Sequence, residues 1–151
     1  MSKNITVFIS YSRDNKEHAD FVLSLINQLR KNGIDAKNDH MLLQRFGIID
    51  FNHRLTQEIA YADFIIIICT PEYAKKADTN VGGIGFETSL LMPLKQTNLN
   101  KYKLVPVVKT ALPHSIPQYL SGINYIDFSD HSLFENNFKE LLHRLTDHAY
   151  T

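Results

Sequence analysis

The feature that most constrains the fold is an unbroken apolar run in the middle of the chain, Phe-Ile-Ile-Ile-Ile-Cys, which directly follows Asp63. A strand with one face in water alternates apolar and polar side chains, whereas a continuous run is typical of a strand buried on both faces. Asp63 to Cys69 is therefore predicted to be a central strand of a parallel sheet. The run is far shorter than the roughly 20 residues that a membrane span needs.

Short apolar stretches and longer amphipathic ones alternate along the rest of the chain. Further strands are predicted at residues 5–10, 34–38, 104–108 and 125–128, where apolar and β-branched residues cluster. Helices are predicted at residues 16–31, 51–61, 86–94 and 134–145, where apolar residues recur at helical spacing. Asn32 and Gly33 supply a stop signal for the first helix. Residues 39–50 follow neither period and are expected to be a loop. Residues 71–85 are polar and then glycine-rich and are expected to be the loop after Cys69. Pro113 and Pro117 bracket a further loop or short helical turn.

This order of elements predicts an α/β fold, a flavodoxin-like five-stranded parallel sheet with strictly alternating strands and helices and with helices on both faces. The 151 residues amount to about one domain, and we expect residues 1–151 to form it. Ligands of such sheets bind beyond the carboxyl ends of the strands. Functional residues are therefore expected in the loops after Ser10, Asn38, Cys69 and Val108.

Charge and composition exclude several classes of function. Sixteen basic and sixteen acidic side chains cancel, so no overall field favours nucleic acid as the main partner, although a local basic patch stays open. The seven histidines show no metal-ligand spacing, and we expect no metal site. Cys69, the single cysteine, is interpreted as a small core residue rather than a nucleophile. The lone cysteine and the lack of an apolar signal segment at the N-terminus lead us to expect a cytoplasmic protein with no membrane partner.

The loop after the first strand argues against two common chemistries of this architecture. A nucleotide-binding fold needs a glycine-rich turn there, but the chain has Ser10-Tyr11-Ser12-Arg13. A phospho-receiver needs paired acids at the end of the first strand and another acid after the third. Serines and Cys69-Thr70 stand in those places.

The segment from Val7 to Asp14, Val-Phe-Ile-Ser-Tyr-Ser-Arg-Asp, closely resembles the first signature box of the Toll/interleukin-1 receptor (TIR) domain family. Asp39 stands where the family has an acid after its second strand, and the loop that follows occupies the place of the family's BB loop. The segment from Leu55 to Tyr73, with its isoleucine strand and its Thr70-Pro71-Glu72-Tyr73 turn, looks like the central part of the family. The resemblance covers nearly the whole chain.

The resemblance implies one of two functions, because some TIR domains only assemble and others hydrolyse NAD+ with a glutamate on the third helix. The matching residue is Glu87, which we expect to be catalytic, with NAD+ as substrate and no cofactor. Loss of nicotinamide leaves a ribose with oxocarbenium-like charge, which a carboxylate stabilises or captures covalently. Glu87 is expected to lie in the first turn of the helix predicted from Phe86, where the positive end of the helix dipole favours the ionised carboxylate. A helix cap is the structural alternative for this glutamate.

Five further residues are expected to bind the substrate. Arg13 is suited to a pyrophosphate, Ser10 and Ser12 offer hydroxyl groups, and Asp39 can bond a ribose hydroxyl or cap the loop after it. Tyr11 is a candidate aromatic wall for nicotinamide, as are Phe46 and Phe86. Hydrolases of the family often carry a tryptophan four residues before the glutamate, where this chain has Gly83 and no tryptophan anywhere. A glycine-rich approach could bring backbone amides close to phosphate or ribose oxygens.

Partner assembly is part of the interpretation, because family members often complete the site with the BB loop of a neighbouring subunit. The 39–50 loop is unusually apolar, which suits homotypic TIR contact, although these side chains could also pack on their own domain. They are Leu42, Leu43, Phe46, Ile48 and Ile49.

We expect an NAD+ glycohydrolase of microbial type, acting in immune or anti-phage defence and giving ADP-ribose or a cyclic product. A non-catalytic TIR adaptor is the alternative, and a nucleoside-processing enzyme is a third. The domain could equally be a part of a longer chain with a separate sensor domain.

Overall fold

The computed structural model describes residues 4–39, 41, 51–95, 103–110 and 115–149. The strands of the described part are β1 (Thr6–Ser10), β2 (Asp35–Asn38), β3 (Phe64–Cys69), β4 (Leu104–Val108) and β5 (Ile126–Asp127). Its helices are α1 (Lys16–Lys31), α3 (Phe51–Tyr61), α4 (Pro71–Asp78), α5 (Gly82–Lys95) and α6 (Phe134–Ala149), with short 3-10 turns η1 (Gln118–Leu120) and η2 (His131–Leu133). None of these helices is long and apolar enough to cross a membrane.

The five strands form one parallel sheet in the order β2-β1-β3-β4-β5. β3 lies at its centre, where Ile66 pairs with Ile9 of β1 on one side and with Val105 of β4 on the other. All six residues of β3 are buried. The predicted central strand and the predicted five-stranded parallel fold are both confirmed.

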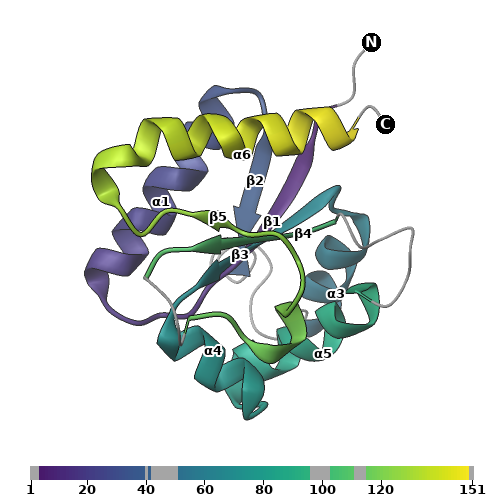
Figure 1. Cartoon of the computed structure of the whole chain (residues 1–151). Coiled ribbons are helices and arrows are strands. Elements are labelled where there is room, and N and C mark those ends of the chain that lie inside the picture. Colours follow the sequence, from purple (N-terminus) through teal and green to yellow (C-terminus); the bar gives the residue numbers. More distant parts are fainter. Residues whose placement is uncertain (1–3, 40, 42–50, 96–102, 111–114, 150–151) are drawn as a thin grey trace.

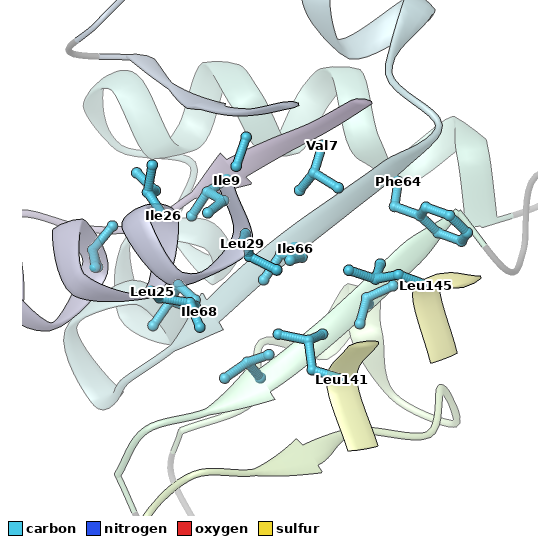
Figure 2. Packing of buried hydrophobic residues seen from close by; sticks show 14 of the residues in the cluster. Val7, Ile9, Leu25, Ile26, Leu29, Phe64, Ile66, Ile68, Leu141 and Leu145 are labelled. Atoms are coloured by element: carbon cyan, nitrogen blue, oxygen red, sulfur yellow. The ribbon is translucent and has the colours of Figure 1, made fainter. Parts of the chain in front are cut away.

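Alternate side chains of the central strands enter two separate cores. The α1/α6 core takes Ile66 and Ile68 of β3, and the α3/α5 core takes Ile65 and Ile67. Figure 1 shows α1 and α6 on one side of the sheet and α3, α4 and α5 on the other. In Figure 2, side chains of α1, the strands and α6 meet in the first core. Burial on both faces explains why β3 has no polar position.

Helix α1 follows its sequence pattern closely. The Asn15 side chain caps it by accepting a hydrogen bond from His18 N at 2.8 Å. The helix ends before Gly33, whose φ of +80° is a left-handed conformation that favours glycine. Its buried stripe consists of Val22, Leu25, Ile26 and Leu29 together with His18. The predicted bounds 16–31, 51–61 and 104–108 match α1, α3 and β4.

The prediction of a loop over residues 71–85 is wrong. Thr70 caps α4, and its Oγ1 accepts a hydrogen bond from Tyr73 N at 3.2 Å. Pro71 occupies the first turn, and Glu72 and Lys76 form an ion pair at 3.4 Å on the exposed side. Two helices, α4 and α5, therefore separate β3 from β4, and the expected strict alternation of strands and helices does not hold there.

Candidate functional site

Ser10 is the last residue of β1 and is followed by Tyr11 to Arg13, while Asp39 follows β2 and Thr70 follows β3. Because parallel strands end at the same edge of the sheet, these residues gather at one edge, as the topology predicts. Glu87 reaches the same region from α5, and Asp39 and Arg13 both act electrostatically on its carboxyl group. The candidate site is this edge of the sheet.

Glu87 is buried because of its position along α5. Ile84, Glu87, Thr88 and Leu91 have the spacing of one helical face, and all four are buried. Ile84 and Leu91 belong to the α3/α5 core, so the side chain between them points at the sheet. Only 2% of the surface of Glu87 is exposed.

The expectation that Glu87 lies in the first turn of its helix is wrong. Helix α5 begins at Gly82, and its first turn contains no acidic residue. The favourable helix dipole therefore cannot be the reason for an ionised Glu87, since that effect is confined to the first turn. A capping role for Glu87 loses its basis for the same reason.

The electrostatic environment of Glu87 favours the protonated form. Burial is the main cause that raises the pKa of this carboxyl well above its ordinary value, and the negative charge of Asp39 adds to the effect. A hydrogen bond with the Ser10 hydroxyl and the positive charge of Arg13 lower the pKa in part. Glu87 Oε1 is buried and has no hydrogen-bond partner among the residues that the structure describes.

Two tyrosines continue the polar contacts of Ser10 into the protein. The Ser10 Oγ and Tyr73 Oη atoms lie 2.7 Å apart, and Tyr73 Oη lies 3.3 Å from Tyr119 Oη. Burial raises the pKa of both phenols, that of Tyr73 well above its ordinary value. Both side chains therefore remain neutral hydrogen-bonding groups at physiological pH.

The other residues of the first loop divide into buried and exposed ones. Ser12 is buried, and its hydroxyl contacts the Asp14 carboxylate and, at 3.4 Å, Thr70 Oγ1. Tyr11 is 8% exposed, and burial and the charge of Asp39 raise its pKa. Arg13 is the exposed member, with 59% of its side chain in solvent, and its Nη2 lies 3.9 Å from Asp39 Oδ2.

Electrostatic interactions thus connect Glu87 with Ser10, Tyr11, Arg13 and Asp39. Ser12 instead contacts Asp14 and Thr70. Among the other candidates for the nicotinamide wall, Phe86 packs partly buried against the α3/α5 core. Phe46 and the other apolar residues of the 42–49 segment lie outside the described residues.

Gly83 lies in the first turn of α5, and open space surrounds the position that a Cβ atom would take there. The glycine-rich segment before Glu87 was expected to bring backbone amides close to the substrate, and at Gly83 this segment is helical.

Sequence reasoning missed Tyr73 and Tyr119 as site residues. For Tyr73 a signal was present, because Tyr73, Ala74 and Ala77 have the spacing of a buried helical face after a Thr-Pro cap. For Tyr119 the sequence held none, since the contact joins residues 46 positions apart.

Cys69 is fully buried in β3, and burial raises its pKa to about 12. The prediction that it is a core residue is confirmed. Within the described ranges, no group of three or more His, Cys, Asp and Glu side chains is placed to hold a metal ion.

A protein-family model described as "TIR domain" matches residues 7–142. A comparison of the sequence with curated proteins gave no match.

The fold is also similar to three solved structures. A prokaryotic SEFIR domain has a TM-score of 0.74 at 24% identity, over 94% of this chain and 92% of that one. The TIR domain of the Toll-related receptor TRR-2 from Hydra magnipapillata has a TM-score of 0.61 at 17% identity, over 93% and 97% of the two chains. The TIR domains of the activated Roq1 resistosome, which recognises the pathogen effector XopQ, have a TM-score of 0.56 at 17% identity, over 95% and 84%. At these identities the similarity shows the fold alone.

Proposed function

Because the chain belongs to the TIR domain family, we propose that it is an NAD+ glycohydrolase in which Glu87 is the catalytic carboxylate. The observation that carries the proposal is the burial of Glu87, whose Oε1 has no hydrogen-bond partner within the described part of the chain. An unsatisfied buried carboxyl oxygen costs stability, and native proteins hold few such groups outside functional sites. The group also lies at the edge of the sheet where folds of this kind bind ligands.

The reaction needs a negative charge close to the anomeric carbon of the nicotinamide ribose. When the C–N glycosidic bond breaks, its electron pair goes to the pyridinium nitrogen and leaves positive charge on the ribose. Ionised Glu87 stabilises that charge, and water then adds to give ADP-ribose, nicotinamide and a proton. Attack by another atom of the same ADP-ribose in place of water gives the cyclic product.

The remaining site residues are proposed to bind and orient NAD+. The exposed guanidinium of Arg13 suits the pyrophosphate, and the Asp39 carboxylate suits a ribose hydroxyl. Tyr11 is proposed as a wall of the pocket. Ser10 and Ser12 are buried hydroxyls, so their proposed contact with the substrate requires the site to open.

Opening of the site is proposed to accompany assembly. A glutamate that is only 2% exposed cannot contact a substrate. TIR domains commonly interact homotypically, and the Roq1 structure is that of an activated resistosome. We propose that contact between copies through the 39–50 loop rearranges the cover over Glu87. A role in immune defence is part of the same proposal.

The decisive experiment measures nicotinamide release from NAD+ by purified protein at high concentration and under crowding. We expect wild type to be active and Glu87→Gln to lose activity by at least a hundredfold, since the ionised group is required. Glu17→Gln, the same change at an exposed position of α1, serves as the matched control and should leave the rate unchanged. A wild-type protein that releases no nicotinamide in the assembled state would contradict the proposal.

A non-catalytic TIR adaptor is the second candidate function. The burial of Glu87 in the single chain also favours this alternative, because no substrate reaches the carboxyl there. An assembled but inactive wild type would support the adaptor. Cleavage of free nucleosides in preference to NAD+ would point instead to a nucleoside-processing enzyme.

A further inference from the structure

Three buried hydroxyl groups from distant parts of the chain form a hydrogen-bonded series, and the first of them, that of Ser10, is hydrogen-bonded to Glu87. Ser10 ends β1, Tyr73 lies in the first turn of α4, and Tyr119 lies in η1. Ser10 and Tyr73 have no exposed surface, and Tyr119 is 7% exposed. The oxygen atoms follow one another at 2.7 Å and 3.3 Å.

When Glu87 is ionised, the number of hydroxyl protons decides which group donates and which accepts in each of these hydrogen bonds. A carboxylate only accepts hydrogen bonds, so Ser10, which is hydrogen-bonded to Glu87, must donate its single proton there. The short contact with Tyr73 is then one in which Tyr73 donates and Ser10 accepts. Since the proton of Tyr73 is used, the contact with Tyr119 is one in which Tyr119 donates.

The surroundings fix the two tyrosines relative to each other. Tyr73 N donates to the Thr70 cap, which holds the first turn of α4 against the end of β3. Gln118 N donates to Asp78 Oδ1 at 2.8 Å, which ties η1 to the end of α4. Both rings lie in the α3/α5 core. The phenol oxygens are therefore held in place by packing, and only the hydroxyl protons are free to turn.

We propose that Tyr73 is a positioning residue for NAD+ cleavage, which holds the only proton of the Ser10 hydroxyl on the Glu87 carboxylate and so supports the ionised form that the reaction needs. The inference rests on the proposed function of Glu87. Tyr119 has the same effect on Tyr73, because the hydrogen bond that it donates holds the Tyr73 proton on Ser10.

A base role for Tyr73 is a poor alternative. Burial raises its pKa well above the ordinary value, so the phenol keeps its proton throughout the working pH range. Its available action is to donate a hydrogen bond. Loss of that donor frees the Ser10 proton to turn away from Glu87, and the carboxyl then ionises at a higher pH.

The test replaces Tyr73 by Phe, which keeps the ring and removes the hydroxyl. The carboxyl titration of Glu87 is followed by ¹³C NMR, and the pH dependence of nicotinamide release is measured on the same proteins. We expect Tyr73→Phe to raise the Glu87 pKa and the acid limb of the rate by about half a pH unit or more. Ser10→Ala should do the same, and Tyr119→Phe should shift both in the same direction by less.

Two comparisons separate positioning from a structural effect. Tyr61→Phe, the same change at a tyrosine that is 79% exposed, should shift neither titration. Addition of Tyr73→Phe to Ser10→Ala should cause no further shift, because Tyr73 acts through Ser10. A Tyr73→Phe protein that is slower but has an unchanged pH profile and an unchanged Glu87 titration would overturn the inference.

The NMR titration keeps this inference separable from the proposed function. If no variant and no wild-type protein cleaves NAD+, the proposed function fails. An unshifted Glu87 titration in Tyr73→Phe, Ser10→Ala and Tyr119→Phe would contradict the hydroxyl chain itself, with or without activity.

Discussion

At the scale of single residues, the burial of Glu87 should destabilise the protein at neutral pH. A carboxyl whose pKa is raised on folding binds its proton more tightly in the folded state than in the unfolded state. Its contribution to stability is therefore fully present below the ordinary value of 4.5 and is lost as pH rises through the folded pKa. The cost is about 1.4 kcal/mol for each unit of the shift.

Glu87→Gln removes this cost and is expected to raise the melting temperature at pH 7 to 8. The gain should shrink as the pH falls and disappear below about pH 4, where the wild-type carboxyl is protonated in both states. Thermal unfolding of the two proteins between pH 4 and pH 8 measures it. A glutamine variant that is less stable than wild type at pH 7.5 would mean that the charge is well compensated in the fold.

The sequence predicted Glu87 as a site residue but did not predict its environment. Resemblance to the TIR family singled out this residue, but the physical argument for its ionisation depended on a helix start at Phe86. With α5 starting at Gly82, the spacing of Ile84, Glu87 and Leu91 indicates burial instead. The pairing of Ser10 with Tyr73 depends on tertiary packing across 63 residues, which no local pattern carries.

At the scale of elements, α4 was missed because seven of the ten residues from Pro71 to Asn80 are polar or proline and its buried face is short. Its start signal was nevertheless present in Thr70-Pro71-Glu72. We expect Thr70→Ala to lower the free energy of unfolding by about 1 to 2 kcal/mol, because the cap on Tyr73 N is lost. Urea unfolding measures the change.

Thr79→Ala provides the comparison at the other end of α4. The Thr79 side chain is exposed, and its hydroxyl bonds back to Lys75 O within the same helix end. This change should alter stability by no more than about 0.5 kcal/mol. Equal effects of the two substitutions would show that the Thr70 cap contributes little.

The glycines of α5 have different roles that substitution can separate. A Cβ atom at Gly85 would lie 2.4 Å from the carbonyl carbon and 2.7 Å from the carbonyl oxygen of Asn80, both backbone atoms. Gly85→Ala should therefore force the turn between α4 and α5 apart and cost about 1 to 3 kcal/mol. At Gly83 nothing lies within 4 Å, so Gly83→Ala should be neutral or stabilise by up to about 1 kcal/mol.

Denaturant unfolding of both alanine variants tests this contrast. Because α5 carries Glu87, the Gly85→Ala protein should also lose NAD+ cleavage, whereas Gly83→Ala should keep it. A stable and active Gly85→Ala variant would show that the turn at Asn80 adapts without moving α5.

At the scale of the whole molecule, the sheet was predictable because the apolar run of β3 admits little else than a central parallel strand. Helices α1, α3 and α6 follow from amphipathic spacing, and the predicted bounds of α1 and α3 match residue for residue, whereas α4 and the first turn of α5 were not predicted. The site was predictable only as an edge of that sheet. Its closure over Glu87 depends on how α5 packs under β1 and β3, which is a property of the complete fold.

Closure of the site in one chain has a consequence for kinetics. If contact between copies is what exposes Glu87, activity depends on a bimolecular step, and the rate per protein molecule should rise with protein concentration. Light scattering should show self-association over the same concentration range. Phe46→Asp, which puts a charge in the apolar 39–50 loop, should weaken both effects together.

Leu23→Asp provides a matched change at an apolar side chain of α1 that is 48% exposed, and it should leave the concentration dependence intact. The two variants distinguish a specific contact through the loop from a general effect of added charge. A strictly monomeric wild type with a constant rate per molecule would show that Glu87 is uncovered by motion within one chain, and assembly would then have no part in catalysis.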